Sequence, residues 1–535
     1  MPRVLIADPL SEAGLALLRE AGVEVVELGT GDRARLLDLV EDADALLVRS
    51  RTKVDAELLR AGRRLKVVGR AGIGVDNVDV ATATELGILV INAPTANLMS
   101  ATEHTFALLL ALARNVPAAD ASMKAGEWDR NRFVGTELQG KTLGIIGLGR
   151  IGQRVAARAK AFEMNVVAFD PFLDPDQGPR LGVDLLLLDD LLRRADVVTL
   201  HTPYTEQTRD LLNAARIALM KPGALLVNCS RGGVVDEAAL LKALESGHLG
   251  GAALDVFADE PPKDLSLAGH PKVVATPHLG AQTAEAQERT STETAQMVLA
   301  ALQGSYAVTA VNLPFRSSGG SRGEPYLRLG EQLGRLSSAL LRSPLKRVQV
   351  DLWGIDEGLQ FPLTLAVLKG VLSPFLGTAV NYVNVERLAQ SRGVETVRAA
   401  HGEPGEYPAL IGVTLHGSDA GADGRVELAG TLFGDRQPRV VRFGRQPLEF
   451  RPEGKLLILR SFDVPGNVGK VGTLLGEAGV NIADIHLARK DGEEDAWTIL
   501  RLDEEPPQSL LERLAALPQM RRVHLADLGR AGEPA

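Results

Sequence analysis

The sequence has very little cysteine and no long hydrophobic run. Cys229 is the single cysteine among the 535 residues, so no disulfide can form within the chain. No apolar run approaches the ~18 residues that a membrane-spanning helix requires, and we therefore expect no membrane contact. The first residues, MPRVLIAD, begin directly as a strand and lack the long apolar core of a secretion signal, which predicts a cytoplasmic protein.

An excess of basic residues is also missing. The formal net charge is −9, which argues against a surface that binds nucleic acid. The hydrophobic share of 45% and the charged share of 24% are typical of a globular protein. A chain of 535 residues is long enough for roughly three or four domains.

Short apolar runs alternate with helical patterns through residues 1–98. The runs are VLIAD, VEVVEL, ADALLVRS, LKVVGRAG and ILVIN. Such βα repetition predicts a parallel sheet covered by helices. A helix from Ser100 to Arg114 is expected next, with Ser100 as its N-cap.

A later segment is expected to return to this first sheet. It consists of a long helix near Thr283–Gln303 and the strand VTAVNLP. The sequence therefore predicts a flavodoxin-like substrate domain that is split between residues 1–98 and 283–313. Residues 99–282 would form a second domain inserted between the two parts.

The inserted region contains a glycine-rich turn. Lys141–Gly152, KTLGIIGLGRIG, is expected to form a strand, a turn and the start of a helix. Gly147, Gly149 and Gly152 fill the pattern G-x-G-x-x-G: the first turns the chain, the second lets backbone approach a pyrophosphate, and the third lets helix pack on strand. The helix N-terminus then offers unpaired N–H groups to the phosphates.

Asp170 completes this dinucleotide pattern. It lies about 20 residues further on, where a carboxylate accepts bonds from both ribose hydroxyls and repels a 2′-phosphate, so NAD is favoured over NADP. The six strands LGIIGLG, NVVAFD, ADVVTLH, ALLVNCS, GAALDVF and KVVATPH alternate with helices. They predict a doubly wound, Rossmann-like α/β domain. An ordinary glycine-bearing βα turn would leave Asp170 unexplained.

The remainder of the chain predicts two further domains. Composition changes at Ser317–Gly323, SSGGSRG, which has the character of a linker. Residues 317–454 combine helical stretches with several strands, predict an α+β domain and carry no catalytic motif. Residues 455–535 follow the order βαββαβ, a ferredoxin-like plan that hosts many functions.

Three charged residues follow expected strand ends, where open α/β sheets bind ligands. They are Arg231 in LLVNCSRGGVVD, Glu260 in ALDVFADEPP and His278 in VVATPHLGAQT. Hydride transfer to a 2-keto acid needs a cation that binds the carboxylate and a proton donor that meets the developing alkoxide. It also needs a group that keeps the pKa of that donor near neutral pH. Arg231 supplies the guanidinium, His278 the acid/base, and Glu260 would favour the imidazolium. Each alone is more often structural, but three together beyond a dinucleotide turn predict an active site.

These motifs resemble the D-isomer-specific 2-hydroxyacid dehydrogenases over roughly residues 1–313. The resemblance implies that Arg231, Glu260 and His278 are catalytic and that NAD is the cofactor. It also implies that the backbone of GRAGIGVDNVD, at Gly72, Ile73 and Gly74, holds the substrate carboxylate. The implied cofactor contacts are Gly147, Gly149, Arg150, Ile151, Gly152, Asp170, His201, Thr202, Pro203, Cys229, Ser230, Asp255, His278, Gly280 and Ala281.

The whole chain is similar to the long-form members of that family. These oxidise 3-phosphoglycerate to 3-phosphohydroxypyruvate, the entry step of serine synthesis, and carry an intervening domain and a C-terminal ACT domain. A phosphorylated substrate needs a second cationic site besides Arg231. In VRSRTKVD, Arg49, Ser50 and Arg51 could supply it, since Arg49 and Arg51 would share one side of a strand end. Two solvated surface arginines are the alternative.

The resemblance also implies regulation. In similar ACT domains serine binds between two subunits as a feedback inhibitor, which implies a homodimer or homotetramer. The implied effector contacts are Ser461, Asp463, Gly466 and Asn481, and Ser461 stands where relatives often carry His or Tyr. A domain that only assembles the oligomer is the alternative.

Other functions remain open at this point. A reductase of glyoxylate, hydroxypyruvate or 2-oxoglutarate would not require Arg49 and Arg51. A dinucleotide-sensing, corepressor-like binding protein would keep a similar active site but has no use for an amino-acid-sensing C-terminus. We expect His201 to line the cofactor cleft, His104 to be structural and Cys229 to be a wall residue. No His/Cys cluster has metal-ligand spacing, so no metal is expected.

Overall fold

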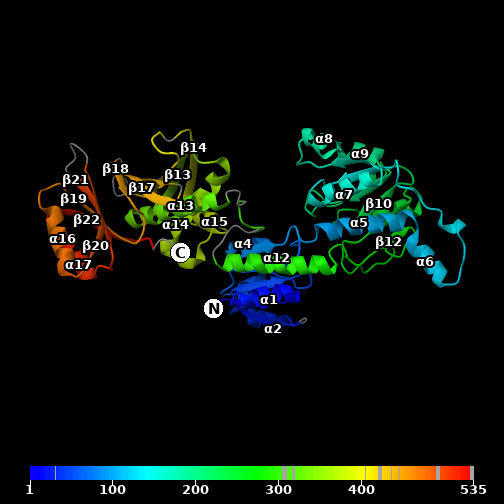
Figure 1. Cartoon of the computed structure of the whole chain (residues 1–535), viewed down its shortest axis with the longest axis horizontal. Helices are drawn as coiled ribbons and strands as arrows, with labels where there is room; N and C mark the ends of the chain where they lie inside the picture. Colours follow the sequence, from blue (N-terminus) through cyan, green and yellow to red (C-terminus); the bar gives the residue numbers. More distant parts are fainter. Residues whose placement is uncertain are drawn as a thin grey trace.

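Four β-sheets follow one another along an elongated molecule (Figure 1). The computed structural model describes residues 1–29, 32–303, 310–315, 320–403, 405–419, 424–434, 436–444, 446–489 and 495–529. The second sheet lies at one end of the view and the fourth sheet at the other, with the first and third sheets between them. This α/β architecture with an added C-terminal part confirms the predicted fold class.

The first sheet is parallel, with the strand order β2-β1-β3-β4-β5 of flavodoxin-like folds. Its strands are β1 (Arg3–Ile6), β2 (Glu24–Glu27), β3 (Ala45–Val48), β4 (Val67–Arg70) and β5 (Leu89–Asn92). Its helices are α1 (Glu12–Glu20), α2 (Arg33–Val40), α3 (Ala56–Ala61), α4 (Val80–Glu85) and α12 (Ala284–Leu302). Every residue of β3 is buried, because helices cover both faces.

The chain returns to this sheet through α12, which packs closely on α1. A Cβ added to Gly14 would lie 2.9 Å from Cβ of Ser291. The predicted strand VTAVNLP falls partly outside the described ranges, which leave out its first two residues. Its described part returns to the first sheet, where it forms one isolated bridge, Ala310 to Ile91. Beyond this bridge the side chain of Asn312 replaces backbone pairing: it accepts the N–H of Val90 and donates to the backbone oxygen of Ile88.

The second sheet is parallel, with the order β12-β11-β10-β9-β6-β7-β8. It has one strand more than the six predicted, because β8 has only two residues and enters an apolar run, LLLL, that continues into α9. The strands are β6 (Thr142–Ile146), β7 (Asn165–Phe169), β8 (Asp184–Leu185), β9 (Val197–Leu200), β10 (Leu225–Asn228), β11 (Gly251–Leu254) and β12 (Val273–Ala275). The helices are α5 (Leu98–Ala113), α6 (Val116–Lys124), α7 (Arg150–Ala161), α8 (Gly178–Leu181), α9 (Leu188–Arg194), α10 (Ala214–Ile217) and α11 (Glu237–Glu245), with the 3-10 turns η1 (Asn131–Phe133) and η2 (Pro175–Gln177).

Helix α5 begins two residues earlier than predicted, and Ser100 is not its N-cap. Asn97 holds that position, while Ser100 is buried inside the first turn. The Ser100 hydroxyl donates to the backbone oxygen of Gly280 at 2.8 Å. A tertiary partner therefore replaces the local capping bond expected of a serine N-cap.

The third sheet is mixed, with the order β14-β13-β15-β16-β17-β18. Its strands are β13 (Leu345–Trp353), β14 (Glu395–His401), β15 (Leu410–Gly417), β16 (Arg425–Phe433), β17 (Gln437–Phe443) and β18 (Gln446–Phe450). Its helices are α13 (Gly320–Leu340), α14 (Glu357–Leu376) and α15 (Val385–Ser391), with the turn η3 (Gly377–Ala379). The expected linker Ser317–Gly323 falls partly outside the described residues, and α13 begins within it.

Helix α14 corrects the expectation about hydrophobic runs. By length and composition it could cross a membrane, and within the described ranges it is the one helix of that kind. Most of its middle turns are buried, and it packs along α13. Lys369 on α14 reaches Glu331 on α13 at 2.9 Å, and Tyr382 donates to the same carboxylate at 2.5 Å. These contacts are those of a core helix.

The fourth sheet is antiparallel, with the order β20-β21-β19-β22. Its elements are β19 (Lys455–Phe462), α16 (Asn467–Glu477), β20 (Ile482–Arg489), β21 (Asp495–Leu502), α17 (Gln508–Ala515) and β22 (Met520–Asp527). The βαββαβ order that the sequence predicted is confirmed.

One hydrophobic cluster runs through the first, third and fourth sheets, each of which also has a further cluster of its own, whereas the second sheet has two clusters and no part in the shared one. Polar contacts also join the first and third sheets. Arg387 of α15 donates to Glu85 of α4 at 2.6 Å, and Asn381 donates to the backbone oxygen of Gly87 at 2.6 Å. Figure 1 shows α4 and α15 on facing sides of this junction.

Candidate active site

Three strand ends of the second sheet meet at one edge. β10, β11 and β12 are parallel neighbours in continuous register, so the loops after them leave the sheet together. Arg231 follows β10, Glu260 lies in the loop after β11, and His278 lies in the loop after β12. The first two loops touch, because a Cβ added to Gly232 would lie 1.8 Å from the backbone oxygen of Phe257.

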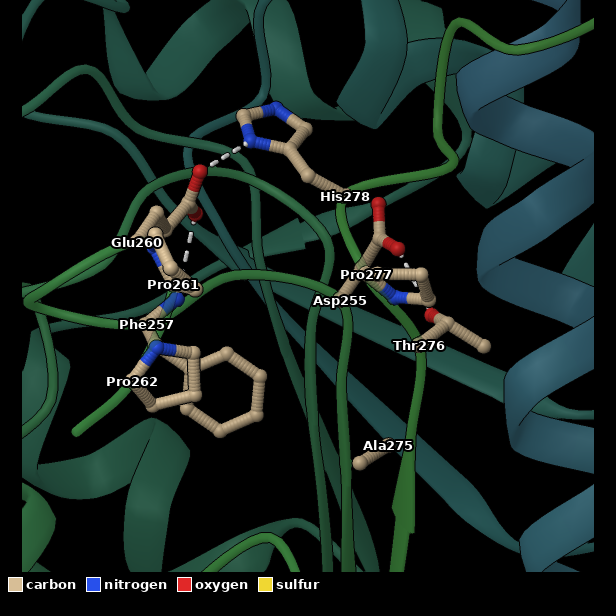
Figure 2. A pocket seen from close by; sticks show the side chains of 9 residues that line it. All are labelled: Asp255, Phe257, Glu260, Pro261, Pro262, Ala275, Thr276, Pro277 and His278. Carbon is tan, nitrogen blue, oxygen red and sulfur yellow. Dashed lines mark hydrogen bonds and ion pairs between the residues drawn. The ribbon is translucent and has the colours of Figure 1, made fainter. Parts of the chain in front are cut away.

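His278 and Glu260 form a hydrogen-bonded pair (Figure 2). Nδ1 of His278 lies 2.7 Å from Oε2 of Glu260, and Oε1 accepts the backbone N–H of Phe257 at 3.2 Å. The side chains are 47% and 39% exposed and border a cavity of about 400 Å³. Asp255, Phe257, Pro261, Pro262, Ala275, Thr276 and Pro277 line the rest of it. With Nδ1 bonded to the carboxylate, Nε2 is the nitrogen left to exchange a proton with a substrate.

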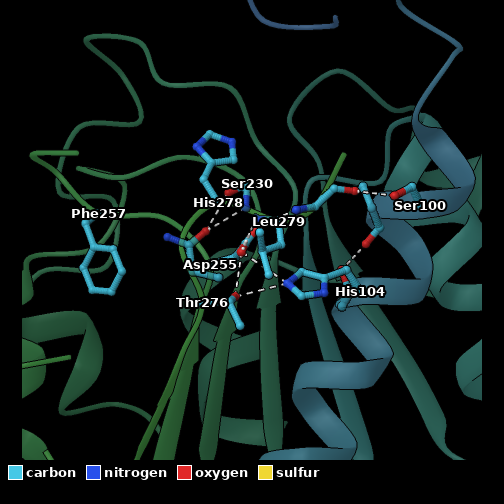
Figure 3. A network of polar contacts seen from close by, with 12 residues as sticks. Ser100, His104, Ser230, Asp255, Phe257, Thr276, His278 and Leu279 are labelled. Carbon is cyan, nitrogen blue, oxygen red and sulfur yellow. Dashed lines mark hydrogen bonds and ion pairs between the residues drawn. The ribbon is translucent and has the colours of Figure 1, made fainter. Parts of the chain in front are cut away.

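A buried carboxylate holds the loop that carries His278 (Figure 3). Asp255 is 1% exposed and accepts bonds from the Leu279 N–H at 2.7 Å, the Gly280 N–H at 2.8 Å and the Thr276 hydroxyl at 2.6 Å. Burial opposes ionisation, but hydrogen bonds from His104 and Thr276 outweigh it and hold the pKa of Asp255 below its usual value. The loop is thereby tied down while His278 keeps a backbone φ of 55°, which non-glycine residues rarely adopt.

His104, Cys229 and Asp255 come together behind this loop. Their potential ligand atoms all lie within 4.8 Å of one another, although their sequence spacing gave no sign of a cluster. Burial and the neighbouring Asp255 raise the pKa of the Cys229 thiol, so the sulfur stays protonated and is a poor metal ligand. Nε2 of His104 lies 3.2 Å from Asp255 and 3.1 Å from Thr276. The three residues thus belong to the network that supports the His278 loop.

Arg231 connects the second sheet, from which it extends, to the first sheet. Its Nε donates to Oδ2 of Asp76 at 3.1 Å, in the loop after β4, and Nη1 donates to the backbone oxygen of Ser230 at 2.7 Å. A Cβ added to Gly74 would lie 2.0 Å from Nη2 of Arg231. The predicted carboxylate-binding loop, residues 72–74, therefore lies directly against Arg231.

Sequence reasoning missed Arg70, the last residue of β4. A Cβ added to Gly72 would lie 1.4 Å from its Nη1, so the side chain folds over the same loop. Among the described residues its buried Nε has no hydrogen-bond partner. Burial, together with the nearby Arg231 and Arg49, lowers the pKa of Arg70 to about 10, so it stays cationic at neutral pH. Its place at a strand end was the signal that could have identified it.

Arg49, Ser50 and Arg51 lie in a turn and not on a strand. β3 ends at Val48, so the predicted alternation of side chains does not apply to them. Arg49 is half-buried and close enough to Arg70 to lower its pKa, whereas Ser50 and Arg51 are exposed. We call Arg49, Arg70 and Arg231 the arginine cluster.

The glycine turn after β6 leaves room for a dinucleotide. A Cβ added to Gly152 would lie 2.2 Å from the backbone oxygen of Gly147, so only glycine permits this contact. A Cβ on Gly149, the N-cap of α7, would meet nothing within 4 Å. Asp170 accepts the N–H of Leu148 at 2.9 Å and so borders the same turn. An open helix N-terminus beside a carboxylate is the arrangement that NAD requires.

Thr202 and His201 lie against this turn. A Cβ added to Gly147 would lie 2.9 Å from Cγ2 of Thr202. The buried Thr202 hydroxyl has no hydrogen-bond partner in the part of the chain that the structure describes. Nε2 of His201 lies 3.1 Å from the Thr199 hydroxyl, and burial lowers the pKa of His201 to about 4, which keeps it neutral. An unpaired buried hydroxyl beside the turn fits a bound dinucleotide that would partner it.

The other predicted cofactor residues lie along the same edge. Arg150 and Ile151 open α7, Pro203 follows Thr202, Ser230 follows Cys229, and Gly280 and Ala281 follow the His278 loop. Ser230 donates both its N–H and its hydroxyl to Oδ1 of Asn228, at 3.0 and 2.8 Å, which fixes the turn before Arg231.

The predicted effector residues differ in exposure. Ser461 on β19 is 1% exposed, and its hydroxyl accepts a bond from Asn467 at 2.6 Å. Asp463 and Asn481 are exposed, and Gly466 is the N-cap of α16 with a φ of 84°. Ser461 therefore supports the start of α16, and Asp463 and Gly466 lie exposed just before this helix. Asn481 lies beyond its other end, where its side chain donates to Asp503 at 2.6 Å.

Known proteins match this chain along its length. The family model "D-isomer specific 2-hydroxyacid dehydrogenase, NAD binding domain" matches residues 106–280, and "D-3-phosphoglycerate dehydrogenase intervening domain" matches residues 323–444. The D-3-phosphoglycerate dehydrogenase of Mycobacterium tuberculosis is 44% identical over 534 residues, 99% of both chains. That of Methanocaldococcus jannaschii is 40% identical over 532 residues, 99% of this chain and 100% of the relative. A D-lactate dehydrogenase from Aquifex aeolicus, solved with NAD and lactic acid, is 32% identical with a TM-score of 0.50, covering 56% of this chain and 96% of that one.

Proposed function

We propose that this chain, which belongs to the family of D-3-phosphoglycerate dehydrogenases, oxidises 3-phosphoglycerate to 3-phosphohydroxypyruvate with NAD in the first step of serine biosynthesis. The observation that carries the proposal is the meeting of the His278–Glu260 pair, the open glycine turn and the arginine cluster at one edge of the second sheet. The relatives that match over the full length support the same substrate.

The geometry supports a catalytic role for each residue of this site. Nε2 of His278 takes the proton of the substrate 2-hydroxyl, and Glu260 stabilises the imidazolium that forms, since its carboxylate bonds Nδ1. Arg231 binds the carboxylate and polarises the carbonyl that develops at C2. NAD, when bound, accepts the hydride that leaves C2. Asp255 keeps the His278 loop in place throughout.

The phosphate end of the substrate is assigned to the turn at residues 49–51. Arg49 contributes a cation beside Arg70, and Ser50 and Arg51 lie in the same exposed turn. The backbone of Gly72, Ile73 and Gly74 lies between this turn and Arg231 and is assigned to the carboxylate end. Two cationic ends suit an acid that carries a phosphate at its other end better than an unphosphorylated one.

The same proposal extends to the remaining domains. The boundaries are residues 1–98 with 283–313 for the substrate domain, 99–282 for the NAD-binding domain, 317–454 for the intervening domain and 455–535 for the ACT domain. L-Serine is the proposed effector at Asp463, Gly466 and Asn481, in a homodimer or homotetramer located in the cytoplasm. The exposed approach to α16 supports an effector there.

The first experiment measures NADH oxidation with 3-phosphohydroxypyruvate beside hydroxypyruvate, glyoxylate and 2-oxoglutarate. We expect wild type to prefer the phosphorylated substrate in kcat/KM. This preference should fall at least tenfold in Arg49→Ala, because the variant loses the charge-assisted hydrogen bonds to the phosphate. Arg63→Ala, an exposed arginine between α3 and β4, is the matched control. Equal turnover of an unphosphorylated keto acid would leave a 2-keto acid reductase and contradict the phosphate assignment. In the same assay His278→Ala should lose turnover at least a hundredfold and still bind NADH.

A further inference from the structure

The turn that carries Arg49 is held at both ends by a buried aspartate. Asp8 follows β1 and is 5% exposed. Its Oδ2 accepts the N–H of Arg49 at 2.6 Å and the N–H of Thr52 at 3.2 Å, and its Oδ1 accepts the Thr52 hydroxyl at 3.0 Å. One carboxylate therefore binds both backbone donors that bracket Ser50 and Arg51.

Asn77 binds the matching backbone acceptors. Its Nδ2 donates to the oxygen of Arg49 at 2.7 Å and to the oxygen of Thr52 at 2.6 Å. The backbone of Asn77 also pairs with this segment, because its oxygen accepts the N–H of Val54 at 2.8 Å. Asp8 and Asn77 together thus bind the N–H and the oxygen of both residues that flank the turn, and we call this arrangement the backbone clamp.

The clamp connects the two ends of the substrate site. Asn77 is the neighbour of Asp76, and Asp76 accepts the bond from Nε of Arg231. The distance between the turn at residues 49–51 and Arg231 is therefore set through two adjacent residues of one loop. Arg231 itself comes from the other sheet and keeps a second bond to Ser230, so it does not depend on the clamp for its own position.

We propose that Asp8 and Asn77 are positioning residues that determine specificity for the phosphorylated substrate, by holding the turn at residues 49–51 at the spacing of a phosphate from the carboxylate on Arg231. This inference rests on the proposed phosphate site. Loss of the clamp frees the turn and misplaces the cation of Arg49, and small misplacements of binding groups have large effects on rate. The carboxylate end, and with it the unphosphorylated substrates, keep their contacts.

The test compares Asn77→Ala and Asp8→Asn with wild type on 3-phosphohydroxypyruvate and on hydroxypyruvate. We expect KM for the phosphorylated substrate to rise about tenfold or more in each, with kcat within about threefold, and kcat/KM for hydroxypyruvate within about twofold. Asn312→Ala is the matched control, since Asn312 also bonds backbone of this sheet, at residues 88 and 90, but away from the turn. A merely structural role would lower activity on both substrates alike.

A cycle with Arg49→Ala separates the two possible failures. If the clamp acts through Arg49, adding Asn77→Ala to Arg49→Ala causes no further loss of discrimination. If Arg49→Ala leaves discrimination unchanged, the phosphate site itself is refuted. If Arg49→Ala abolishes discrimination while Asn77→Ala and Asp8→Asn preserve it, only the clamp is refuted. Should a clamp variant fail to fold, Thr52→Ala removes one clamp bond and Thr52→Ser restores it, with the same expected change in KM and its recovery.

Discussion

The substitution Glu260→Gln tests whether the carboxylate beside His278 assists catalysis. It keeps an oxygen that can accept from Nδ1 and removes only the charge. Two unit charges about 4 Å apart interact by ~1 kcal/mol in water and ~4 kcal/mol near a protein surface. Because the two side chains are 47% and 39% exposed, the lower part of that range applies, about 1–2 kcal/mol.

That energy acts on the imidazolium as it forms, so it appears in kcat. At 1.36 kcal/mol per tenfold, we expect kcat to fall about 5- to 30-fold. The KM values for NAD and 3-phosphoglycerate should stay within about twofold, since the lost charge contacts His278 and not the substrate. The assay is the initial rate of NADH formation, with the exposed neighbour Asp259→Asn as control. A kcat within twofold of wild type, or an equal loss in Asp259→Asn, would refute the role given to Glu260.

Three further predictions concern cofactor binding and stability. Gly152→Ala places a Cβ 2.2 Å from a backbone oxygen of the glycine turn, so NADH affinity measured by fluorescence titration should fall at least tenfold; unchanged affinity would contradict the packing. Lys369→Met leaves the largely buried carboxylate of Glu331 without its cationic partner and with the Tyr382 hydroxyl as a neutral donor, which should cost about 3 kcal/mol in denaturant unfolding, and adding Glu331→Gln should recover part of it. Burial and nearby arginines lower the pKa of His524 to about 4, so between pH 6.5 and 4 only the unfolded chain takes up its proton and stability falls as the pH falls. That effect is about 2 kcal/mol between pH 7 and 5, and the drop in Tm over this interval should be smaller in His524→Asn; equal drops would refute it.

The sequence predicted that three candidate active-site residues follow neighbouring strand ends, because parallel strands bring their carboxyl ends to one edge. Arg231, Glu260 and His278 needed only correct strand ends for their placement along the sheet. Arg70 also lies at a strand end. The glycine-rich motif that follows it indicates a backbone site, and nothing in the motif indicates that the side chain of Arg70 folds over these glycines. The clamp residue Asn77 could not be found this way, since its partners lie more than twenty residues away and are backbone atoms.

Local patterns failed where tertiary partners competed with them. Ser100 matched a capping pattern, but its hydroxyl bonds Gly280 in the His278 loop. Arg49 and Arg51 matched the alternation of a strand, but β3 ends at Val48. The chain bends there, where the backbone N–H of Arg49 donates to Asp8. The hydrophobic run of α14 is hard to recognise in the sequence because Lys369 and two prolines interrupt it, and the partner that stabilises the charge is a glutamate on another helix.

The shared core of the first, third and fourth sheets has a consequence for how the molecule melts. The first, third and fourth sheets also have clusters of their own, but one continuous cluster joins all three, whereas the two clusters of the nucleotide-binding sheet include no residue of the others. Cooperative units follow such clusters, so heating should give two calorimetric transitions and not four. A dinucleotide that binds only the folded second sheet would shift one transition upward with the logarithm of its concentration and leave the other where it is. Thermal shift with NAD would thus report on one part of the chain, and the C-terminal sheet would melt together with the first and third sheets.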